Sequence, residues 1–416
     1  MKILVVSQYY WPEPFRITDI CEGLRDRGHE IDVLTSVPNI PEGKFYDGYG
    51  WFKHGEKEHN GVKLDRVNVI QRGRDKPLRL ALNCASFAIN SLFHLPKFRN
   101  KNYDAVFVFN NSPVSAIYPA KVFSEWKKIP YLVFVLDIWP DSMYLLLNMP
   151  IEAKETLFRK ISFKISRWLY SGAQTLLISS KGMRQKLAEM NLSNTIEYFP
   201  NYAEPMRACA DSVGIPSRVG LGFSDDDIVI GFAGNVGKAQ GLEKVVEAAA
   251  KLKDSKNVKF LIVGDGSELL NLRELCKKSE VADSFVFTGW VDGGRVSDYI
   301  SLCDVMLACL KDNEVLNLTL PAKVQTYMDA QKPVLSFMNG AGSEVVSEAE
   351  CGFTARAEDS DSLCRAIEKI AECDTKELER LGMNAKKYCR EHFDRNKIID
   401  SLERYLLEAK ESYNRK

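Results

Sequence analysis

The 416-residue sequence is poor in histidine, and its cysteines are scattered. Only five histidines occur, and none of them is spaced as a pair of metal ligands. The ten cysteines form no C-x-x-C pair, which argues against a zinc site or a disulfide framework. We therefore expect reduced core cysteines in a cytoplasmic protein, with no metal and no other cofactor.

Long hydrophobic runs are also missing. No stretch reaches the roughly 20 apolar residues that a membrane-spanning helix needs. The opening MKILVVS leads into polar sequence, so we expect no signal peptide. With 45% hydrophobic and 27% charged residues, the composition is that of a globular chain, and the length predicts two domains.

The net charge of zero hides an asymmetry between the two halves. Residues 1–200 contain 27 Lys and Arg against 20 Asp and Glu, whereas residues 201–416 contain 29 against 36. A basic half suggests an anionic partner, such as a phospholipid surface, a lipid diphosphate or nucleic acid. We expect a lipid partner and no nucleic acid.

Short apolar runs alternate with helical periodicity, which predicts an α/β fold with parallel sheets. In the first half we expect strands at 3–7, 30–35, 105–109, 131–136 and 175–178, and helices at 18–27 and 151–170. The pattern lapses over 198–222 and begins again with a strand at 228–233 and a helix at 241–252. Two doubly wound domains are therefore predicted, 1–203 and 204–395. An apolar stripe over 397–410 predicts a last helix.

In open α/β sheets, ligands bind beyond the carboxyl ends of strands, so we expect the site in the cleft between the domains. One candidate loop of the second domain begins at Gly234 and carries Lys238. Its glycines would let a phosphate approach the amides of the next helix, and Lys238 would add positive charge. An ordinary strand–helix turn explains the glycines equally well. The other candidates in this loop are Asn235, Gly237 and Gln240.

Two further loops follow apolar strands. Gly264 would permit close approach of a ligand, although a capped helix start explains the same sequence. Gly289, Trp290 and Val291 could frame a planar base, and the alternative for Trp290 is a core or rim side chain.

The fourth loop runs from Asn317 through Leu318 and Thr319 into a helix. Pro321 suits the first turn of that helix, and Lys323 then lies within reach of a diphosphate. The alternative is a surface lysine.

In the first domain, Asp137 directly follows an apolar strand. It would project at the carboxyl edge of the sheet, where a general base belongs, although a helix cap or a structural hydrogen bond is the alternative. Arg16 lies beyond the first strand and would bind phosphate or pair with Asp19.

The segment 72–101 predicts contact with a membrane. A helix at 80–95 is uncharged and mostly apolar, and it is too short to span a bilayer. Such a helix can lie in a membrane interface with its basic flanks on anionic headgroups. A buried core helix is the alternative. The basic flanks are Arg72, Arg74, Lys76, Arg79, Lys97, Arg99 and Lys101.

Several motifs together resemble the retaining glycosyltransferases of family 4, which have the GT-B fold of two Rossmann-like, doubly wound parallel-sheet domains facing a cleft. The motifs are YYWPEP, RITDICEGLRDRGHEIDVLT, PNIPEGK, LDIWPDS, FAGNVGKAQGLEKVVEAA, LIVGDGSE, FTGWV, LPAKVQTYMDAQKPV and ECGF. They look most like the N-acetyl-L-fucosaminyl transferases of O-antigen and capsule assembly.

This resemblance implies that the second domain binds a nucleotide-sugar, often UDP-linked, and that the first binds the acceptor. It implies transfer with retention and without a metal, and a last helix, 396–416, that returns to the first domain. The candidate acceptor residues are Arg16, Tyr10, Trp139 and Asp141.

The sequence departs from the family at charged positions. An arginine and a lysine common in the glycine loop correspond to Asn235 and Gln240, and the customary glutamates fall near Leu318 and Thr326. Lys238, Lys323 and Arg16 would then supply the positive charge. Gln325 would replace the glutamate that binds ribose.

We therefore expect an enzyme that transfers a sugar from a nucleotide-sugar to a lipid-linked acceptor at the inner face of the cytoplasmic membrane. Asp137 would orient or deprotonate the acceptor hydroxyl, while Lys238 and Lys323 stabilise the departing diphosphate. The alternatives are a non-catalytic glycosyltransferase-like binding partner, which the missing glutamates suggest, and a nucleotide-sugar epimerase of the same architecture.

Overall fold

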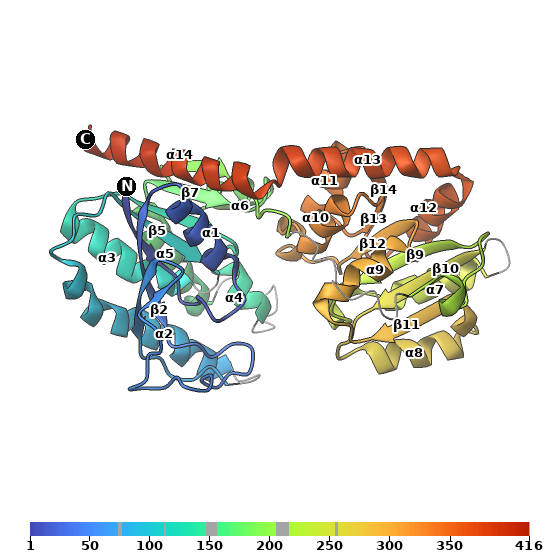
Figure 1. Ribbon diagram of the computed structural model, residues 1–416, viewed down its shortest axis with the longest axis horizontal. Helices are drawn as coiled ribbons and strands as arrows, with labels where there is room; N and C mark the ends of the chain where they lie inside the picture. Colours follow the sequence, from blue (N-terminus) through green and yellow to red (C-terminus); the bar gives the residue numbers. More distant parts are fainter. Residues whose placement is uncertain (74–76, 112–113, 147–155, 205–215, 254–256, 416) are drawn as a thin grey trace. The chain divides into compact units, whose positions relative to one another are not determined.

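The computed structural model describes residues 1–73, 77–111, 114–146, 156–204, 216–253 and 257–415. The chain divides into two compact units, Met1–Pro200 with Asn396–Lys416, and Asn201–Arg395 (Figure 1). The predicted boundary after residue 203 is three residues beyond this division. Part of the predicted lapse, 205–215, lies outside the described residues, as do Arg74 and Lys76.

The first unit is built on an eight-stranded sheet in the order β3-β4-β2-β1-β5-β6-β7-β8. Neighbouring strands are parallel except for the short β3/β4 hairpin. The strand order reverses between β1 and β5. The bounds are β1 Lys2–Val6, β2 Glu30–Ser36, β3 Glu58–His59, β4 Val62–Val67, β5 Ala105–Asn110, β6 Tyr131–Val135, β7 Thr175–Ile178 and β8 Thr195–Tyr198.

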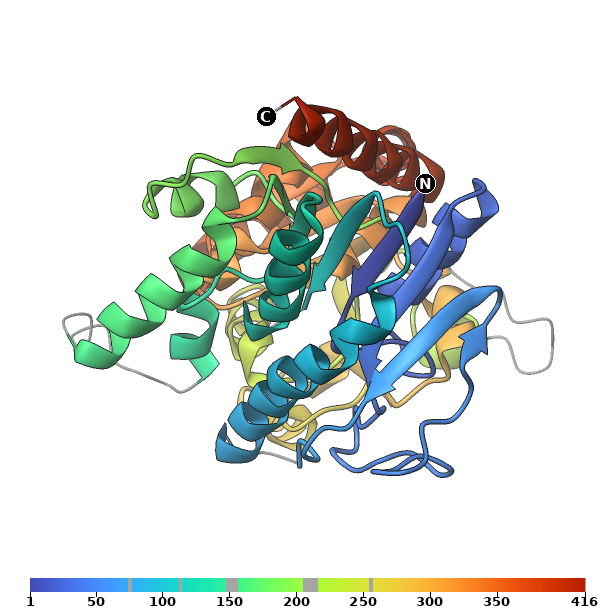
Figure 2. The same ribbon diagram turned by 90° about the vertical axis from the view of Figure 1, so that its left-hand side faces the viewer.

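Helices cover both faces of this sheet, so β1, β5, β6 and β7 are buried on both sides and consist almost entirely of apolar residues. Helices α2, α3 and α5 lie side by side over one face (Figure 2). The helix bounds are α1 Arg16–Asp26, α2 Pro77–His94, α3 Ile117–Lys127, α4 Asp141–Leu146, α5 Leu157–Ser171 and α6 Met183–Ala188.

The last helix, α14 (Arg395–Asn414), packs on the first unit. Its buried stripe includes Ile398, Leu402 and Leu406, as the sequence pattern predicts. Ion pairs fix its ends: Asp400 lies 2.5 Å from Arg27, and Lys410 lies 2.7 Å from Asp104. This segment is therefore a structural part of the first unit.

The second unit is built on a six-stranded, all-parallel sheet in the order β11-β10-β9-β12-β13-β14. The strand order reverses between β9 and β12. The strands are β9 Ile228–Ala233, β10 Val258–Val263, β11 Phe285–Gly289, β12 Val305–Cys309, β13 Val334–Phe337 and β14 Gly352–Ala355. The helices are α7 Glu243–Lys251, α8 Leu269–Lys278, α9 Val296–Ser301, α10 Ala322–Asp329, α11 Ala341–Glu348, α12 Ser360–Glu372 and α13 Thr375–His392.

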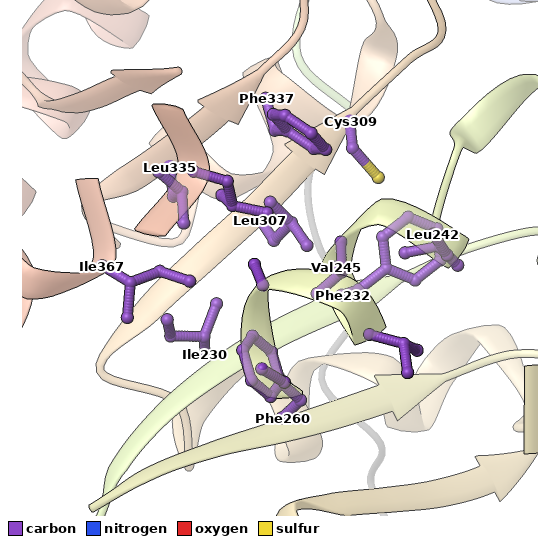
Figure 3. Packing of buried hydrophobic residues seen from close by; sticks show 14 of the residues in the cluster. Ile230, Phe232, Leu242, Val245, Phe260, Leu307, Cys309, Leu335, Phe337 and Ile367 are labelled. Atoms are coloured by element: carbon purple, nitrogen blue, oxygen red, sulfur yellow. The ribbon is translucent and has the colours of Figure 1, made fainter. Parts of the chain in front are cut away.

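The core of the second unit forms where one face of the sheet meets α7, α8 and α12. Ile230 and Phe260 of the strands pack with Val245 of α7 and Ile367 of α12 (Figure 3). All the cysteines that the structure describes are free, and all but Cys373 are buried, which confirms the predicted core role. This rigid sheet holds the loops at its carboxyl edge in fixed positions.

Candidate functional site

The glycine loop after β9 lies against the loop after β10, and backbone hydrogen bonds join them. Gly234 N donates to Val263 O (2.9 Å), and Val236 N donates to Asp265 O (2.9 Å). Gly264 N in turn donates to Gly289 O at the end of β11 (3.0 Å). The ends of three neighbouring strands therefore form one continuous backbone edge.

Gly264 is required for this packing. Its φ is 135°, and a Cβ at this position would lie 2.0 Å from Gly234 O. Close packing of the two loops is therefore sufficient to explain a glycine at this position, and approach of a ligand to Gly264 stays a prediction.

Gly234 is different, because its open side faces Lys323. A Cβ built on Gly234 would lie 3.7 Å from Lys323 Nζ and would touch no other group as closely. Gly234 directly follows β9 and Lys323 lies in the first turn of α10, after β12, so the two residues flank the point where the strand order reverses. This is where open α/β sheets bind ligands.

The Lys323 ammonium lies in largely apolar surroundings. Its Nζ donates to Gln240 Oε1 (2.7 Å) and lies 3.9 Å from the centre of the Phe232 ring. Burial lowers its pKa to about 8. Within the described part of the chain, no carboxylate pairs with it. A desolvated ammonium without a counter-ion favours binding of an anion.

The other predicted residues of the glycine loop surround this point. Lys238 is exposed and has no hydrogen bond or ion pair to any described residue, so it is free to reach an anion. It begins a short 3₁₀ helix, Lys238–Gln240. The Asn235 side chain lies over Gly237, where a Cβ would be 2.7 Å from Asn235 Nδ2.

The residues predicted to frame a base lie at the end of β11. Trp290 is 74% exposed, so it is a surface side chain rather than a core one. Val291 is half-buried and packs against the apolar cluster on the other face of the sheet. Gly289 has a φ of 71°, which turns the chain after β11.

The loop before α10 is held by its own side chains. Asn317 Nδ2 donates to Asp312 Oδ1 (2.8 Å), and Thr319 Oγ1 donates to Val315 O (3.4 Å). Leu318 ends a short 3₁₀ helix. These contacts fix the approach to Lys323, and a role of Asn317, Leu318 and Thr319 in binding the nucleotide stays a prediction.

Gln325 is a wrong prediction. It is buried, with 1% exposure, and its Nε2 donates to Asn201 O (2.5 Å) in the same unit. Residues two apart on a helix point about 200° apart, so Gln325 faces the core because Lys323 faces the loop. Thr326 lies nearer to the Lys323 face, and its hydroxyl donates within the helix to Ala322 O (3.1 Å).

In the first unit, Asp137 lies just after β6 and is half-buried, with no hydrogen bond or ion pair to any described residue. Burial raises the pKa of its carboxyl. An unpaired, half-buried carboxyl at the carboxyl edge of a sheet is a candidate acid or base rather than a structural group.

Three of the predicted acceptor residues lie at this sheet edge, and one does not. Trp139 N, after β6, is 3.4 Å from the Tyr170 hydroxyl, and Asp141 begins α4. Arg16 is the first residue of α1 and is half-buried. Tyr10 is 1% exposed and packs in the core beside Cys21 of α1, so it is not available to an acceptor.

Sequence reasoning missed two polar residues at the carboxyl edge of the first sheet. Asn110 ends β5, is fully buried, and neither atom of its side-chain amide has a partner among the described residues. Gln8 follows β1; its Nε2 donates to Asn83 Oδ1 (2.6 Å), while its Oε1 has no described partner. They flank the reversal of strand order between β1 and β5. A polar residue ending an apolar strand was the available signal.

No group of three or more His, Cys, Asp or Glu side chains in the described ranges is placed to hold a metal ion. Likewise, none of the described helices is long and apolar enough to cross a membrane.

Two protein families match the chain. The family described as "Glycosyl transferase 4-like domain" matches residues 15–202, and the family described as "Glycosyl transferases group 1" matches residues 216–388. Together these matches cover most of the chain, one in each unit.

Curated relatives carry related names. WcaI of Escherichia coli K12, named as a glycosyl transferase of colanic acid biosynthesis, is 26% identical over 286 residues, 67% of this chain and 69% of its own. WbjE of Pseudomonas aeruginosa, also named as a glycosyltransferase, is 24% identical over 257 residues, 60% of this chain and 61% of its own.

Among solved structures, Anabaena HepE in complex with UDP has a TM-score of 0.71 and 17% identity, covering 98% of this chain and 100% of its own. At this identity the likeness shows the fold, which is GT-B, as the sequence predicts.

Proposed function

We propose that the chain is a family 4 glycosyltransferase that moves a sugar from a UDP-sugar to a lipid-linked saccharide in the synthesis of a bacterial surface polysaccharide, which the two glycosyltransferase family matches and the relative WcaI support. N-acetyl-L-fucosamine is the sugar that the sequence motifs favour. HepE was crystallised with UDP and with UDP-glucose, and WcaI is named for colanic acid biosynthesis, which supports the choice of donor and pathway.

The observation that carries the proposal is the unpaired Lys323 ammonium facing the open side of Gly234. In our proposal the donor diphosphate lies there, and Lys323 exchanges its hydrogen bond with Gln240 for a phosphate oxygen. Lys238 adds a second charge from the same loop. A cation already held in a dry site stabilises the charge of the leaving diphosphate without reorganisation.

The proposed reaction retains the configuration at the sugar and uses no metal. The bond between the sugar C1 and the diphosphate oxygen breaks, and the acceptor oxygen bonds to C1 on the same face. The acceptor proton passes to the leaving diphosphate. Before the transfer, Asp137 accepts the hydrogen bond of the acceptor hydroxyl and orients its oxygen toward C1; as the diphosphate leaves, the hydroxyl turns this proton to it.

Trp290 is proposed to cover the uracil base, because it is an exposed aromatic ring on the strand-end edge that carries Gly234. Gln325 is excluded from the ribose site by its contact with Asn201. Backbone groups beyond β10 and β11 would then bind the ribose.

Binding of UDP and of UDP-sugars by calorimetry tests the donor, followed by product analysis with a lipid-linked acceptor. Release of UDP only in the presence of an acceptor, with one sugar added to it, is the expected result. The absence of glutamates at Leu318 and Thr326 favours a non-catalytic binding partner as the second candidate. UDP binding without any transfer would identify that candidate, and a change of the sugar without an acceptor would identify an epimerase.

A further inference from the structure

Helix α5 has an apolar face that does not point into the core. Its buried residues are Ser166, Leu169 and Tyr170. On another side five large apolar side chains are exposed. They are Leu157 (72%), Phe158 (48%), Ile161 (48%), Ile165 (49%) and Trp168 (49%). At about 100° per residue, these five occupy a single arc of about 100°, separate from the buried one.

Cations border this arc. Lys160, Lys164 and Arg167 are exposed and lie on the side of the helix next to the apolar arc. No Asp or Glu occurs in α5. Arg159, the fourth cation, turns away and lies 3.9 Å from the centre of the Tyr144 ring. The exposed surface of α5 is therefore apolar and positively charged.

The neighbouring helices extend this surface. Trp126 of α3 is 45% exposed, and the buried Lys121 of α3, paired with Glu125 (2.8 Å), lies 5.1 Å from the centre of the Trp168 ring. Because α3 contacts both α2 and α5, the three helices form one layer (Figure 2).

Helix α2 adds a second exposed stripe. The predicted membrane helix at 80–95 is α2, and its Phe87 side is buried in the core. Its exposed side carries Leu78 (73%), Leu82 (43%), Ile89 (54%) and Phe93 (75%), which recur at helical spacing. We call the exposed side chains of α2, α3 and α5 named here the apolar face.

We propose that the apolar face docks on an anionic phospholipid bilayer, with α5 as its main contact. The apolar arc of α5 would enter the boundary between headgroups and acyl chains, while Lys160, Lys164 and Arg167 contact lipid phosphates. A second copy of this chain fits less well, since symmetric pairing of α5 helices would bring rows of like charge together. The inference deepens the proposed function, because a lipid-linked acceptor lies in a membrane.

Flotation with vesicles tests the proposal. The full chain should float with vesicles of phosphatidylcholine mixed with phosphatidylglycerol, and much less with phosphatidylcholine alone. Added salt should weaken the binding. The double variant Ile161→Glu/Ile165→Glu should lose binding by about tenfold or more. The variant Lys160→Gln/Lys164→Gln should lose the preference for the anionic lipid.

The matched control is Leu270→Glu, because Leu270 is 75% exposed on α8 of the other unit. This variant should float like the wild type. Thermal unfolding and UDP binding establish that each variant is folded, and UDP binding also separates this inference from the proposed function. Loss of UDP binding with intact flotation would contradict only the donor site.

Two results would overturn the inference. One is flotation of the α5 double variant at the wild-type level. The other is a dimer in light scattering that the same variant converts to a monomer, with no vesicle binding by the wild type, since that would assign the apolar face to a second copy.

Discussion

The affinity for UDP should fall at alkaline pH because Lys323 loses its proton. Burial lowers the pKa of this ammonium to about 8 in the free protein, and no described carboxylate compensates its charge. A bound diphosphate would raise the pKa again, so binding takes up a proton above pH 8. Between pH 7 and pH 9 the dissociation constant should rise by about tenfold.

Two variants of Lys323 test how the charge of this side chain sets the affinity for UDP and its dependence on pH. Lys323→Arg keeps a charge over this whole range, so its affinity should not change with pH. Lys323→Met removes a charged hydrogen bond worth about 1.5–3 kcal/mol, which predicts binding about 10- to 150-fold weaker at pH 7 and little further loss at pH 9.

Lys332 is the control, because it is also a lysine whose pKa is lowered by burial but it lies away from the proposed diphosphate site. It precedes β13 at the opposite edge of the same sheet, its pKa is lowered by burial, and its Nζ donates to the carbonyls of Ser301 and Cys303. Lys332→Met should lower stability and leave the pH profile of UDP binding unchanged. Calorimetry at a series of pH values measures each profile. A wild-type affinity that stays constant from pH 7 to pH 9 would refute the assignment of Lys323.

Three further outcomes follow from other residues. Asp137→Asn should lower the rate of transfer by about 10²-fold without changing UDP affinity, because the acceptor hydroxyl loses the carboxylate that orients it. Loss of UDP affinity instead would remove Asp137 from the acceptor reaction. Gly264→Ala should lower the free energy of unfolding by about 2–4 kcal/mol, because its Cβ would lie 2.0 Å from Gly234 O and its φ is 135°. An unchanged free energy of unfolding in urea denaturation would contradict this packing. Burial raises the pKa of Glu13 from 4.5 to about 7, although Asn39 N and Ile40 N both donate to its Oε1 (2.8 Å). The folded state therefore holds this proton more tightly, and the resulting stability is full below pH 4.5 and lost as pH rises through 7. Between pH 5 and pH 8 the free energy of unfolding should therefore decline by up to about 3 kcal/mol less in Glu13→Gln than in the wild type. Urea midpoints that are identical in the two proteins over this pH range would contradict the role of Glu13.

The sequence was sufficient to predict the two α/β units and to name Gly234 and Lys323 as candidates for one ligand site, whereas the pairing of β9 with β12 came from the structure. Apolar strands followed by glycines and helices define a doubly wound sheet, and such a sheet brings the loops at its reversal point together. Gly234 and Lys323 are far apart in the chain, yet this rule places them in one site. The strands β3, β4, β8 and β14 were missed, since β3, β8 and β14 have only two to four residues and the apolar residues of β4 are interrupted by charged ones.

The predictions that failed depended on the direction of a side chain. Gln325 was assigned to the ribose by its place near a motif, but its phase on α10 points it into the core. Tyr10 was assigned to the acceptor because it follows the first strand, but its side chain is 1% exposed and lies beside Cys21 of α1. The exposed arc of α5 was missed for the same reason, because the pattern of an amphipathic helix does not state which apolar side faces the core.

The most direct test of the diphosphate site is a structure determined with UDP bound. We predict that a phosphate oxygen lies within hydrogen-bond distance of Lys323 Nζ, above Gly234, with the Gln240 side chain released from the lysine. A structure in which UDP binds elsewhere, or in which Lys323 keeps its hydrogen bond to Gln240 and touches no phosphate, would contradict this account.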